Sequence, residues 1–310
     1  MDTLLAVQGW NRVRVTSGIV LMIGITAVST ASILIRNAQG EAPSLVIAAF
    51  RLTIASLVVA PVALWRHQNE LRKLQAREWL LATASGVFLA LHFASWITSL
   101  EYTSVASSVV LDATSPVWVA VGSWLFLRER LTRPVVSGLI VAFAGALIIG
   151  LGDTIIGSRS APLLGNSLAL VGALTVTGYW LIGRRVRGSL SLTPYVAIAY
   201  STAAVVLLIM VGAAHQPLAG YDTMTYTWLV LLALVPQLIG HSSFNWALAR
   251  LPAVFVAVAT LGEPIGATVL AFILLGETPT VVRLLGAALV LVGIAVTLRG
   301  QPNAGSIEAQ

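Results

Sequence analysis

The sequence predicts an all-α integral membrane protein with ten transmembrane helices, built as two inverted five-helix repeats with both termini cytoplasmic. The first observation behind this prediction is composition, because 57% of the 310 residues are hydrophobic and only 10% are charged, with a mean hydropathy of +0.91. A chain this apolar is expected to have lipid as its solvent. The other two observations are the similarity of the two halves and the uneven placement of the basic residues.

The predicted spans use nearly the whole chain. A helix that crosses the hydrocarbon core needs roughly 20 mostly apolar residues. The candidate spans are 15–36, 43–65, 79–100, 103–127, 134–151, 162–183, 193–214, 227–249, 251–276 and 281–298. The first span is too long for the core of a signal peptide, so we expect it to begin after Arg12 and Arg14 and to stay in the mature chain.

Basic residues concentrate on one side of the predicted membrane. Of the 18 Lys and Arg residues, only Arg36, Arg159 and Arg283 fall on the side opposite the N-terminus, and Arg51 lies within the second span. The other fourteen fall on the N-terminal side. The positive-inside rule therefore places both termini in the cytoplasm, as tails 1–14 and 299–310 of a multi-pass protein of the cell (inner) membrane.

The two halves of the chain align with each other at an offset of 148 residues. At this offset SPVWVAVGSWLFLRERLTRPVVSG matches EPIGATVLAFILLGETPTVVRLLG without a gap, and the aligned pairs are Pro116 with Pro264, Glu129 with Glu277, Gly138 with Gly286 and Gly145 with Gly293. Each half holds five spans, an odd number, so the repeats 15–151 and 162–298 are predicted to be inverted. Inverted repeats are typical of secondary transporters with a site near the bilayer midplane. A duplicated scaffold without transport is the alternative.

The arrangement of five plus five spans, with Pro, twelve residues, Glu and a short Gly-spaced helix at the end of each half, resembles the EamA family of the drug/metabolite transporter superfamily. The resemblance covers about 15–298. Within that family the length and the intramembrane tryptophans are similar to those of aromatic amino-acid exporters of the YddG type. The resemblance implies a central cavity and the efflux of amino acids or related metabolites.

An acidic residue in the ninth span is the first candidate for function. A charge in mid-span costs on the order of 3 kcal/mol on insertion scales, so such residues usually face a partner or water. Glu263 precedes Pro264, and its counterpart Ser115 precedes Pro116; each proline removes a helical hydrogen bond, and we expect a hinge at both. Glu263 either takes a proton, holds a substrate ammonium, or pairs with Arg51 or a helix end.

A second pair of charges lies in the first repeat. Asp112 stands one turn before Pro116 and shares a helical face with Ser108 and Ser115, so it is expected to project into the same cavity. Arg51 is the candidate partner of Asp112 in a structural ion pair that locks two helices, because Arg pairs bidentately and stays charged.

Two polar stripes are predicted to face this cavity from pseudo-symmetric helices. In the third span His92 and Trp96 are four residues apart, and in the eighth Gln237, His241 and Asn245 repeat at the same interval. Hydrogen bonding between helices is the alternative role for these side chains. Deep aromatic residues could form an apolar wall, or they could face lipid; they are Trp96, Trp118, Tyr179, Trp180 and Trp246.

Glycines seven residues apart in the fifth and tenth spans predict close helix packing, either inside the chain or between two copies. The expected state is therefore a monomer or a homodimer. Glu129 and Glu277 stand at the ends of spans four and nine. They are predicted to cap a helix end or to form a gate contact.

Other classes of function fit the sequence less well. Residues 150–153 spell the GxGD of intramembrane aspartyl proteases, but the accompanying Tyr221–Asp222 follows it and both lie in predicted outside loops. HExxH, GxSxG and Walker motifs are absent, so we expect no enzyme, no catalytic residue and no cofactor. Two histidines without a carboxylate cluster predict no metal, and basic clusters between spans predict no nucleic acid. The expected partners are a small-molecule substrate, an amino acid or metabolite, and the lipid bilayer. A proton-coupled multidrug or metabolite carrier and a channel remain alternatives.

Overall fold

The computed structural model describes residues 2–103, 108, 111–129, 131–151, 161–275 and 281–299, and within these ranges it is helical with no β-strand. The α-helices are α1 (Asp2–Val28), α2 (Ala31–Ala38), α3 (Ser44–Arg66), α4 (Gln68–Lys73), α5 (Ala76–Tyr102), α7 (Ser115–Gly122), α8 (Arg133–Leu151), α9 (Pro162–Val186), α10 (Leu192–Ala213), α11 (Thr223–Leu232), α12 (Ser242–Leu248), α13 (Ala253–Thr260), α14 (Glu263–Leu275) and α15 (Val281–Arg299). Two π-helices, η1 (Ser123–Leu127) and η2 (Ala233–His241), continue α7 and α11.

Six helical segments in the described part of the chain are long and apolar enough to cross a membrane. They are Val15–Ala38, Ser44–Arg66, Ala76–Tyr102, Leu163–Val186, Leu192–Ala213 and Thr223–Leu248. Shorter apolar helices lie at Ser115–Leu127, Arg133–Gly145, Ala253–Gly266 and Leu284–Thr297. All ten fall on predicted spans, and the number that cross the membrane stays a prediction.

The first span differs from the continuous helix predicted to begin after Arg14. Helix α1 begins at Asp2 and ends at Val28, and a turn at Ser29 and Thr30 separates it from α2. The Ser29 and Thr30 hydroxyls donate hydrogen bonds to the carbonyls of Ile25 and Ala27, both at 2.7 Å. Such local side-chain bonds compete with the helical backbone ladder, which accounts for the break.

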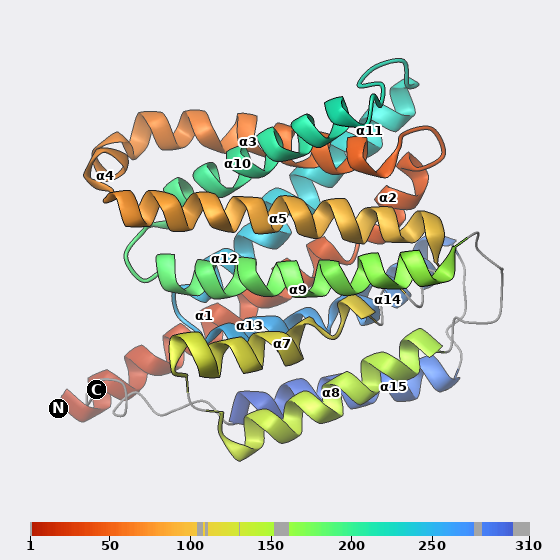
Figure 1. The fold of residues 1–310 in the computed structure, drawn as a ribbon. Coiled ribbons are helices and arrows are strands. Elements are labelled where there is room, and N and C mark those ends of the chain that lie inside the picture. The colour runs from red at the N-terminus through yellow and green to blue at the C-terminus, as the bar shows by residue number, and fades with distance from the viewer. Residues whose placement is uncertain are drawn as a thin grey trace.

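The packing of helices repeats between the two halves (Figure 1). Helix α5 packs along α9, and its counterpart pair, α1 with η2 and α12, also packs together. Helices α1 and α9 occupy equivalent positions in the two repeats and run in opposite directions in Figure 1, as inverted repeats require. The equivalent helices α3 and α10 contact each other, as do α8 and α15.

The glycines of the fifth and tenth spans pack α8 against α15 within one chain. A Cβ atom added to Gly138 would lie 2.6 Å from the carbonyl oxygen of Gly293, and one added to Gly145 would lie 2.6 Å from that of Gly286. Only glycine allows such close approach of the backbones. The predicted packing between these helices is therefore intramolecular.

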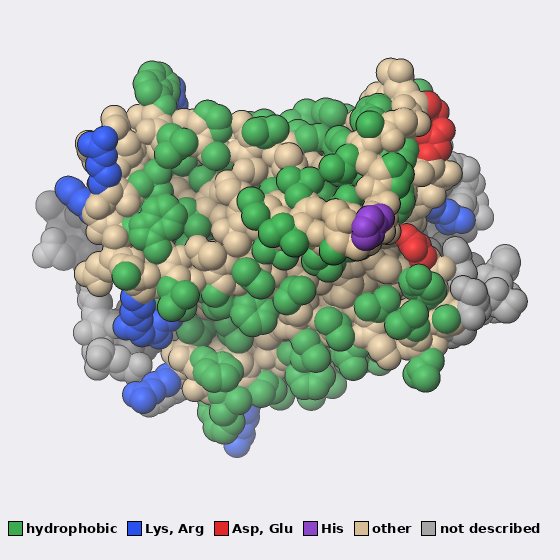
Figure 2. Space-filling model, turned by 45° about the horizontal axis from the view of Figure 1, so that its top comes forward, with side chains coloured by type: hydrophobic (Ala, Val, Ile, Leu, Met, Phe, Trp, Pro, Cys, Tyr) green, Lys and Arg blue, Asp and Glu red, His purple; other side chains and the backbone are tan. Residues whose placement is uncertain are grey.

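Charged side chains gather at the two ends of the bundle and apolar ones cover its flank (Figure 2). Large apolar side chains such as Trp124, Phe126 and Ile209 are 60%, 71% and 66% exposed, as expected for a surface against lipid. On the face shown, most Lys and Arg side chains lie at the end where α1 begins and α15 ends, and the acidic side chains lie at the other. We call these the basic end and the acidic end.

Candidate functional site

A small cavity of about 50 Å³ lies between the two repeats, which is room for a few water molecules. It is lined by Val28, Ala31, Arg51, His92, Phe93, Trp96, Asp112, Ser115, Val176, Trp180, His241, Phe244, Thr260 and Glu263. Of the predicted cavity residues it therefore brings together His92, Trp96, Asp112, Ser115, His241 and Glu263, and it adds Arg51.

Equivalent positions of the two repeats line the cavity. Ten of its fourteen lining residues form pairs separated by 148 positions. The pairs are Val28 with Val176, Phe93 with His241, Trp96 with Phe244, Asp112 with Thr260 and Ser115 with Glu263. Both halves thus contribute the same five positions to one cavity, as expected for a site at the interface of inverted repeats.

Two helix breaks at equivalent positions carry the carboxylates. Turns at 113–114 and 261–262 interrupt the fourth and ninth spans. Asp112 stands before the first turn, whereas Glu263 stands after the second as the first residue of α14, where the helix dipole favours a negative charge. Pro116 and Pro264 fall in the first turn of the helix that follows each break, where a proline fits without loss of a helical hydrogen bond. Their role as hinges stays a prediction.

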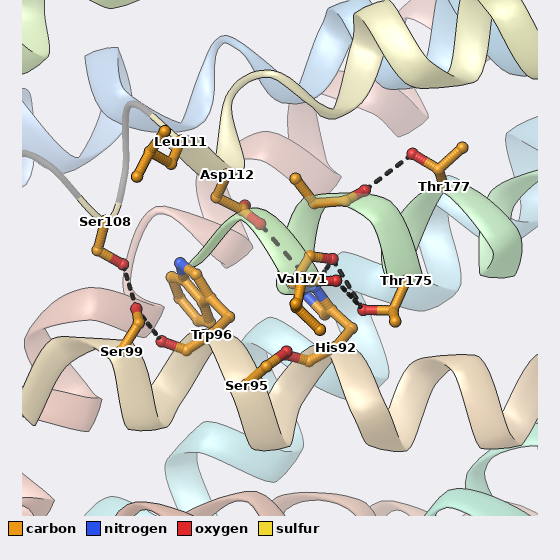
Figure 3. Close-up of polar contacts among 12 residues, drawn as sticks. His92, Ser95, Trp96, Ser99, Ser108, Leu111, Asp112, Val171, Thr175 and Thr177 are labelled. Carbon is orange, nitrogen blue, oxygen red and sulfur yellow. Dashed lines mark hydrogen bonds and ion pairs between the residues drawn. The ribbon is translucent and has the colours of Figure 1, made fainter. Parts of the chain in front are cut away.

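His92 ties the first break to α5 and α9 (Figure 3). Its Nδ1 lies 3.0 Å from the carbonyl oxygen of Gly172 and 3.9 Å from Oδ1 of Asp112. The imidazole stacks on Trp96, with ring centroids 6.0 Å apart and planes 5° apart. Further along α5, Ser99 shares a hydrogen bond of 2.6 Å with Ser108, which follows the helix. The predicted stripe of His92 and Trp96 therefore faces the helix break that holds Asp112.

A second stacked pair forms the opposite wall. The rings of Trp180 and His241 are 6.1 Å apart with planes at 2°, and His241 also meets Phe93 and Phe244 edge-on, at 5.3 and 6.1 Å. Trp180 was predicted as one of several deep aromatic residues, but Phe93 was not. The signal for Phe93 was its alignment with His241 at the repeat offset.

Arg51 differs from its predicted role as the partner of Asp112. Its Nε donates a 2.8 Å hydrogen bond to Oε1 of Gln237, and its guanidinium lies over the ring of Phe93, 4.1 Å from the centroid. Among the described residues no carboxylate lies within 4.0 Å of this guanidinium. The acids stand at breaks in other helices, whereas the amide and the ring reach Arg51 directly. Arg51 is only 1% exposed.

Gln237 and Asn245 are buried beside the cavity rather than lining it, which corrects the prediction of one stripe with His241. Each amide instead has a protein partner, because Gln237 accepts a hydrogen bond from Arg51 and Asn245 donates to Tyr179. Gln237 and His241 belong to the π-helix Ala233–His241. Pro236 within it cannot donate to an α-helical ladder.

A buried cluster of hydroxyl and amide groups lies on the basic side of the cavity. The Asn245 amide donates to the hydroxyls of Tyr179 and Tyr200 at 2.5 and 3.4 Å, and Tyr200 and Ser242 share a 3.2 Å hydrogen bond. Tyr179 thus belongs to this cluster and not to the cavity wall. Tyr195, bonded to Ser85 at 2.7 Å, extends the cluster. Sequence reasoning missed Tyr195 and Tyr200, whose signal was a hydroxyl on two side chains of the predicted span 193–214.

Two of the predicted aromatic residues lie away from the cavity. Trp118 is 39% exposed, and its indole donates to Thr114 at 3.1 Å. Trp246 stacks under Arg250, whose guanidinium lies 3.6 Å from the ring centroid. An all-apolar helix has no polar face to show which side meets lipid, so sequence could not separate these residues from Trp96 and Trp180.

Nearer the basic end, Glu129 binds the second repeat. Nε of Arg184 donates a 3.1 Å hydrogen bond to Glu129, and Nη1 of Arg184 donates to the carbonyl of Leu248 at 2.8 Å. Glu129 therefore makes a contact between repeats. Its counterpart Glu277 lies outside the described residues.

The two sequences that resembled an aspartyl protease do not form a site among the described residues. Gly152 and Asp153 of the GxGD sequence lie outside the described residues. Asp222 caps the N-terminus of α11 through a 2.6 Å bond from the Thr225 amide. Among the described residues no group of three or more His, Asp or Glu side chains is placed to hold a metal ion.

The chain is similar to proteins named as transporters over 63% to 86% of its length. It is 26% identical to an uncharacterised transporter, YxxF, of Bacillus subtilis over 86% of this chain and 85% of that protein. It is 26% identical to a probable terminal-alkyne amino-acid exporter of Streptantibioticus cattleyicolor, over 80% and 82% of the two chains. It is 29% identical to a probable amino-acid metabolite efflux pump of Salmonella typhimurium, over 63% and 67%.

A solved crystal structure shares the fold. It superimposes with a TM-score of 0.75 at 17% sequence identity and covers 91% of this chain and 96% of that chain. The sequence profile of the EamA-like transporter family matches residues 16–151 and again 163–299, once in each repeat. This protein therefore belongs to the EamA-like transporter family.

Proposed function

We propose that this protein is a secondary transporter that exports aromatic or neutral amino acids, or related small metabolites, by alternating access through the central cavity. The observation that carries the proposal is that five pairs of positions, related by the repeat offset, line one cavity with buried polar and aromatic groups. Two similar bundles around one site can exchange roles, which is the basis of alternating access. The amino-acid export named for two relatives agrees with this substrate class.

The transport cycle requires the repeats to move apart. A cavity of about 50 Å³ holds a few waters, so a solute the size of an amino acid enters only when the helices around it separate. Towards the basic end this separation breaks the buried cluster of hydroxyl and amide groups around Asn245 and the contact of Glu129 with Arg184. Bending at the breaks before Pro116 and Pro264 would let the short helices follow either bundle.

The proposed topology has ten spans with both termini cytoplasmic, in the cell membrane. Two features support it: α1 begins and α15 ends at the same end of the bundle, and most basic side chains on the visible face lie there (Figures 1 and 2). The positive-inside rule assigns this end to the cytoplasm.

A proton-coupled carrier of drugs or other metabolites is the second candidate. It is favoured by the two carboxylates, Asp112 and Glu263, that line the same cavity inside the membrane. Intramembrane carboxylates frequently serve proton relays. A channel or a membrane-embedded enzyme would not need the paired arrangement around one small cavity.

Counterflow in proteoliposomes tests the proposed function. Purified protein is reconstituted, loaded with unlabelled phenylalanine, tryptophan, threonine or methionine, and given the labelled amino acid outside, with and without a pH gradient. Saturable exchange of any of them supports the proposal, and exchange that ignores the gradient identifies facilitated export. Accumulation that needs the gradient identifies proton coupling. No flux of any amino acid rejects the proposed substrate class.

A further inference from the structure

Buried polar atoms without a hydrogen-bond partner gather around the central cavity. Four residues that line it each have such an atom: Nη1 of Arg51, Nε1 of Trp96, Oδ1 of Asp112 and Nδ1 of His241. Leaving a buried polar group unpaired costs about 1–3 kcal/mol, and more for a charged one, so native proteins rarely keep several in one place. Their concentration here indicates a site built for a polar ligand.

The charges around the cavity are held apart. Arg51 is fixed from one side by Gln237 and Phe93, which leaves Nη1 without a protein partner. Asp112 and Glu263 line the same cavity, and neither lies within 4.0 Å of Arg51. A structural ion pair would bring these groups into contact to offset the cost of burial. Opposite charges kept separate across one cavity instead match a ligand that carries both signs.

We propose that this cavity binds a zwitterionic α-amino acid, with Arg51 holding the ligand carboxylate and Asp112 and Glu263 holding its ammonium group. This inference rests on the proposed function and names the groups that recognise the substrate. The planar guanidinium suits a carboxylate because it donates parallel hydrogen bonds. The indole of Trp96 and the imidazole of His241 supply further donors, and the two stacked aromatic pairs flank the space for an apolar side chain.

Ligands with a single charge fit the cavity less well. A simple amine would leave the buried guanidinium of Arg51 unpaired, and a simple carboxylate would face Asp112 and Glu263 without an ammonium group between them. Each arrangement leaves a buried charge without a partner, which is costly. A site built to bond a group rejects the analogue that lacks it.

The test is direct binding by calorimetry with the full-length protein in lipid nanodiscs. The probes are two matched sets: phenylalanine, phenethylamine and 3-phenylpropionate; and leucine, isopentylamine and 4-methylpentanoate. In the wild type we expect at least one amino acid to bind about tenfold or more tightly than both of its analogues. In Arg51→Gln that amino acid should lose about tenfold to 100-fold in affinity, while its amine changes less than about threefold.

A second variant keeps the arginine and changes its neighbour. Gln237→Glu places a carboxylate of the same shape at the atom that accepts from Nε of Arg51, 2.8 Å away. The guanidinium then has an internal counter-ion, so the preference for the amino acid over its amine should fall here too, even if Arg51→Gln fails to fold. Arg184→Gln is the matched control, because it removes an arginine that pairs with Glu129 outside the cavity. It should leave the ligand preference unchanged.

The outcomes separate this inference from the proposed function. Loss of the zwitterion preference in Arg51→Gln or Gln237→Glu, and not in Arg184→Gln, supports the inference. If amino acids undergo counterflow but the wild type binds amines or acids equally well, or if both cavity variants keep the preference, the assignment of Arg51 is wrong and the transporter stands. If no amino acid is bound or exchanged, both fall together.

Discussion

The two helix breaks in the cavity have the same backbone and different chemistry. The first reads Asp112-Ala-Thr-Ser115-Pro and the second Thr260-Leu-Gly-Glu263-Pro, with the turn at the same two positions of each. Proline follows both turns, so both breaks keep the feature that shapes the chain. The acid, however, precedes the turn in one repeat and follows it in the other, so the charge is not part of what the scaffold needs.

The same difference extends to the rest of the cavity. Phe93 stands where the second repeat has His241, and Trp96 where it has Phe244. Arg51 has Ala199 as its counterpart. A fully symmetric cavity would accept a ligand in two equivalent orientations, whereas one arginine and two unequal acids favour a single one. Duplication thus explains where the cavity lies, and divergence supplies the unequal charges on which the proposed recognition of an amino acid depends.

Making the two breaks alike should have the largest effect on transport. The double variant Asp112→Thr/Glu263→Ser gives both repeats the residues Thr and Ser around the turn. We expect phenylalanine counterflow to fall more than about 100-fold, because the ligand ammonium loses both charged partners. The thermal unfolding temperature should hold or rise, because two charges inside the membrane-spanning part of the chain are removed.

Counterflow and unfolding temperature are measured on the same reconstituted preparation. The single variants Asp112→Thr and Glu263→Ser serve as comparisons, each with a smaller loss. Normal exchange by the double variant would mean that the carboxylates have no part in the site. A collapse of the unfolding temperature would make them structural.

A second, smaller effect is expected where each repeat supports the aromatic wall of the other. A Cβ on Gly172 would lie 3.1 Å from Cβ of Trp96, and one on the equivalent Gly24 would lie 2.9 Å from the ring of Phe244. Gly172→Ala and Gly24→Ala should each lower the unfolding free energy by about 1–3 kcal/mol through overpacking. Gly172→Ala should also weaken phenylalanine binding about threefold to tenfold, because the whole indole and the bond between His92 and Gly172 must shift.

The control for this pair is Gly18→Ala on the same helix as Gly24. Nothing lies within 4 Å of a Cβ added there, so this variant should be neutral or slightly stabilising, as is usual for a glycine replaced inside a helix. Thermal unfolding and calorimetric binding check all three variants. Equal behaviour of the three would contradict the close contact between repeats.

The sequence predicted the residues of the cavity that stand out in an apolar span or that recur at the repeat offset. Asp112, Glu263 and the two prolines are visible because an acid or a proline in an apolar run is costly unless something uses it. The partner of Arg51 was not predictable, because Gln237 is 186 positions away and either acid was an equally reasonable partner. Only tertiary packing decides among them.

Partners on other helices account for the other differences. An interval of four residues places side chains near one helical face but does not show which groups they bond, and here Gln237 bonds to Arg51 and Asn245 to Tyr179. Trp118 was misplaced for a different reason, because hydropathy cannot tell a cavity from lipid when every neighbour is apolar. The tyrosines of α10 were missed because a tyrosine in an apolar span reads as apolar, although the hydroxyls of Tyr195 and Tyr200 bond to Ser85 and Ser242.

At the two ends of the molecule the first repeat supplies acids that hold the second. Glu70, beyond the end of α3, accepts hydrogen bonds from the amide and hydroxyl of Ser191 at 2.7 and 2.6 Å, at the start of α10. Glu41, before α3, accepts from the amide of Asp222 and the hydroxyl of Thr225, both at 3.0 Å, at the start of α11. In the second repeat the counterpart of Glu70 is Leu218 and that of Glu41 is Ser189, so neither contact is duplicated.

Removing these two contacts should give the smallest effects, and each removal should open a different end of the molecule. Partial burial raises the pKa of Glu70, but the hydrogen bonds from Ser191 and the nearby His67 outweigh it, so the pKa lies below its ordinary value of 4.5. Glu70 therefore adds stability above pH 4.5 that is lost as the pH falls through its folded pKa. Glu70→Gln should lower the unfolding free energy at pH 7 by less than about 1 kcal/mol, as for other contacts at an aqueous surface, and this loss should shrink as the pH falls below 4.5.

Because the chain has no cysteine, a single Val176→Cys in the cavity wall reports which end is open to a membrane-impermeant thiol reagent. Combined with it, Glu70→Gln should increase labelling from the basic end, and Glu41→Gln should increase labelling from the acidic end. Each increase should be about twofold to fivefold, because each variant destabilises the closed state of one end by less than about 1 kcal/mol. Equal labelling from both ends in both variants would mean that these acids only cap helices. A shift to the same end in both would place the two contacts on one side of the moving interface, contrary to their positions at opposite ends of α3.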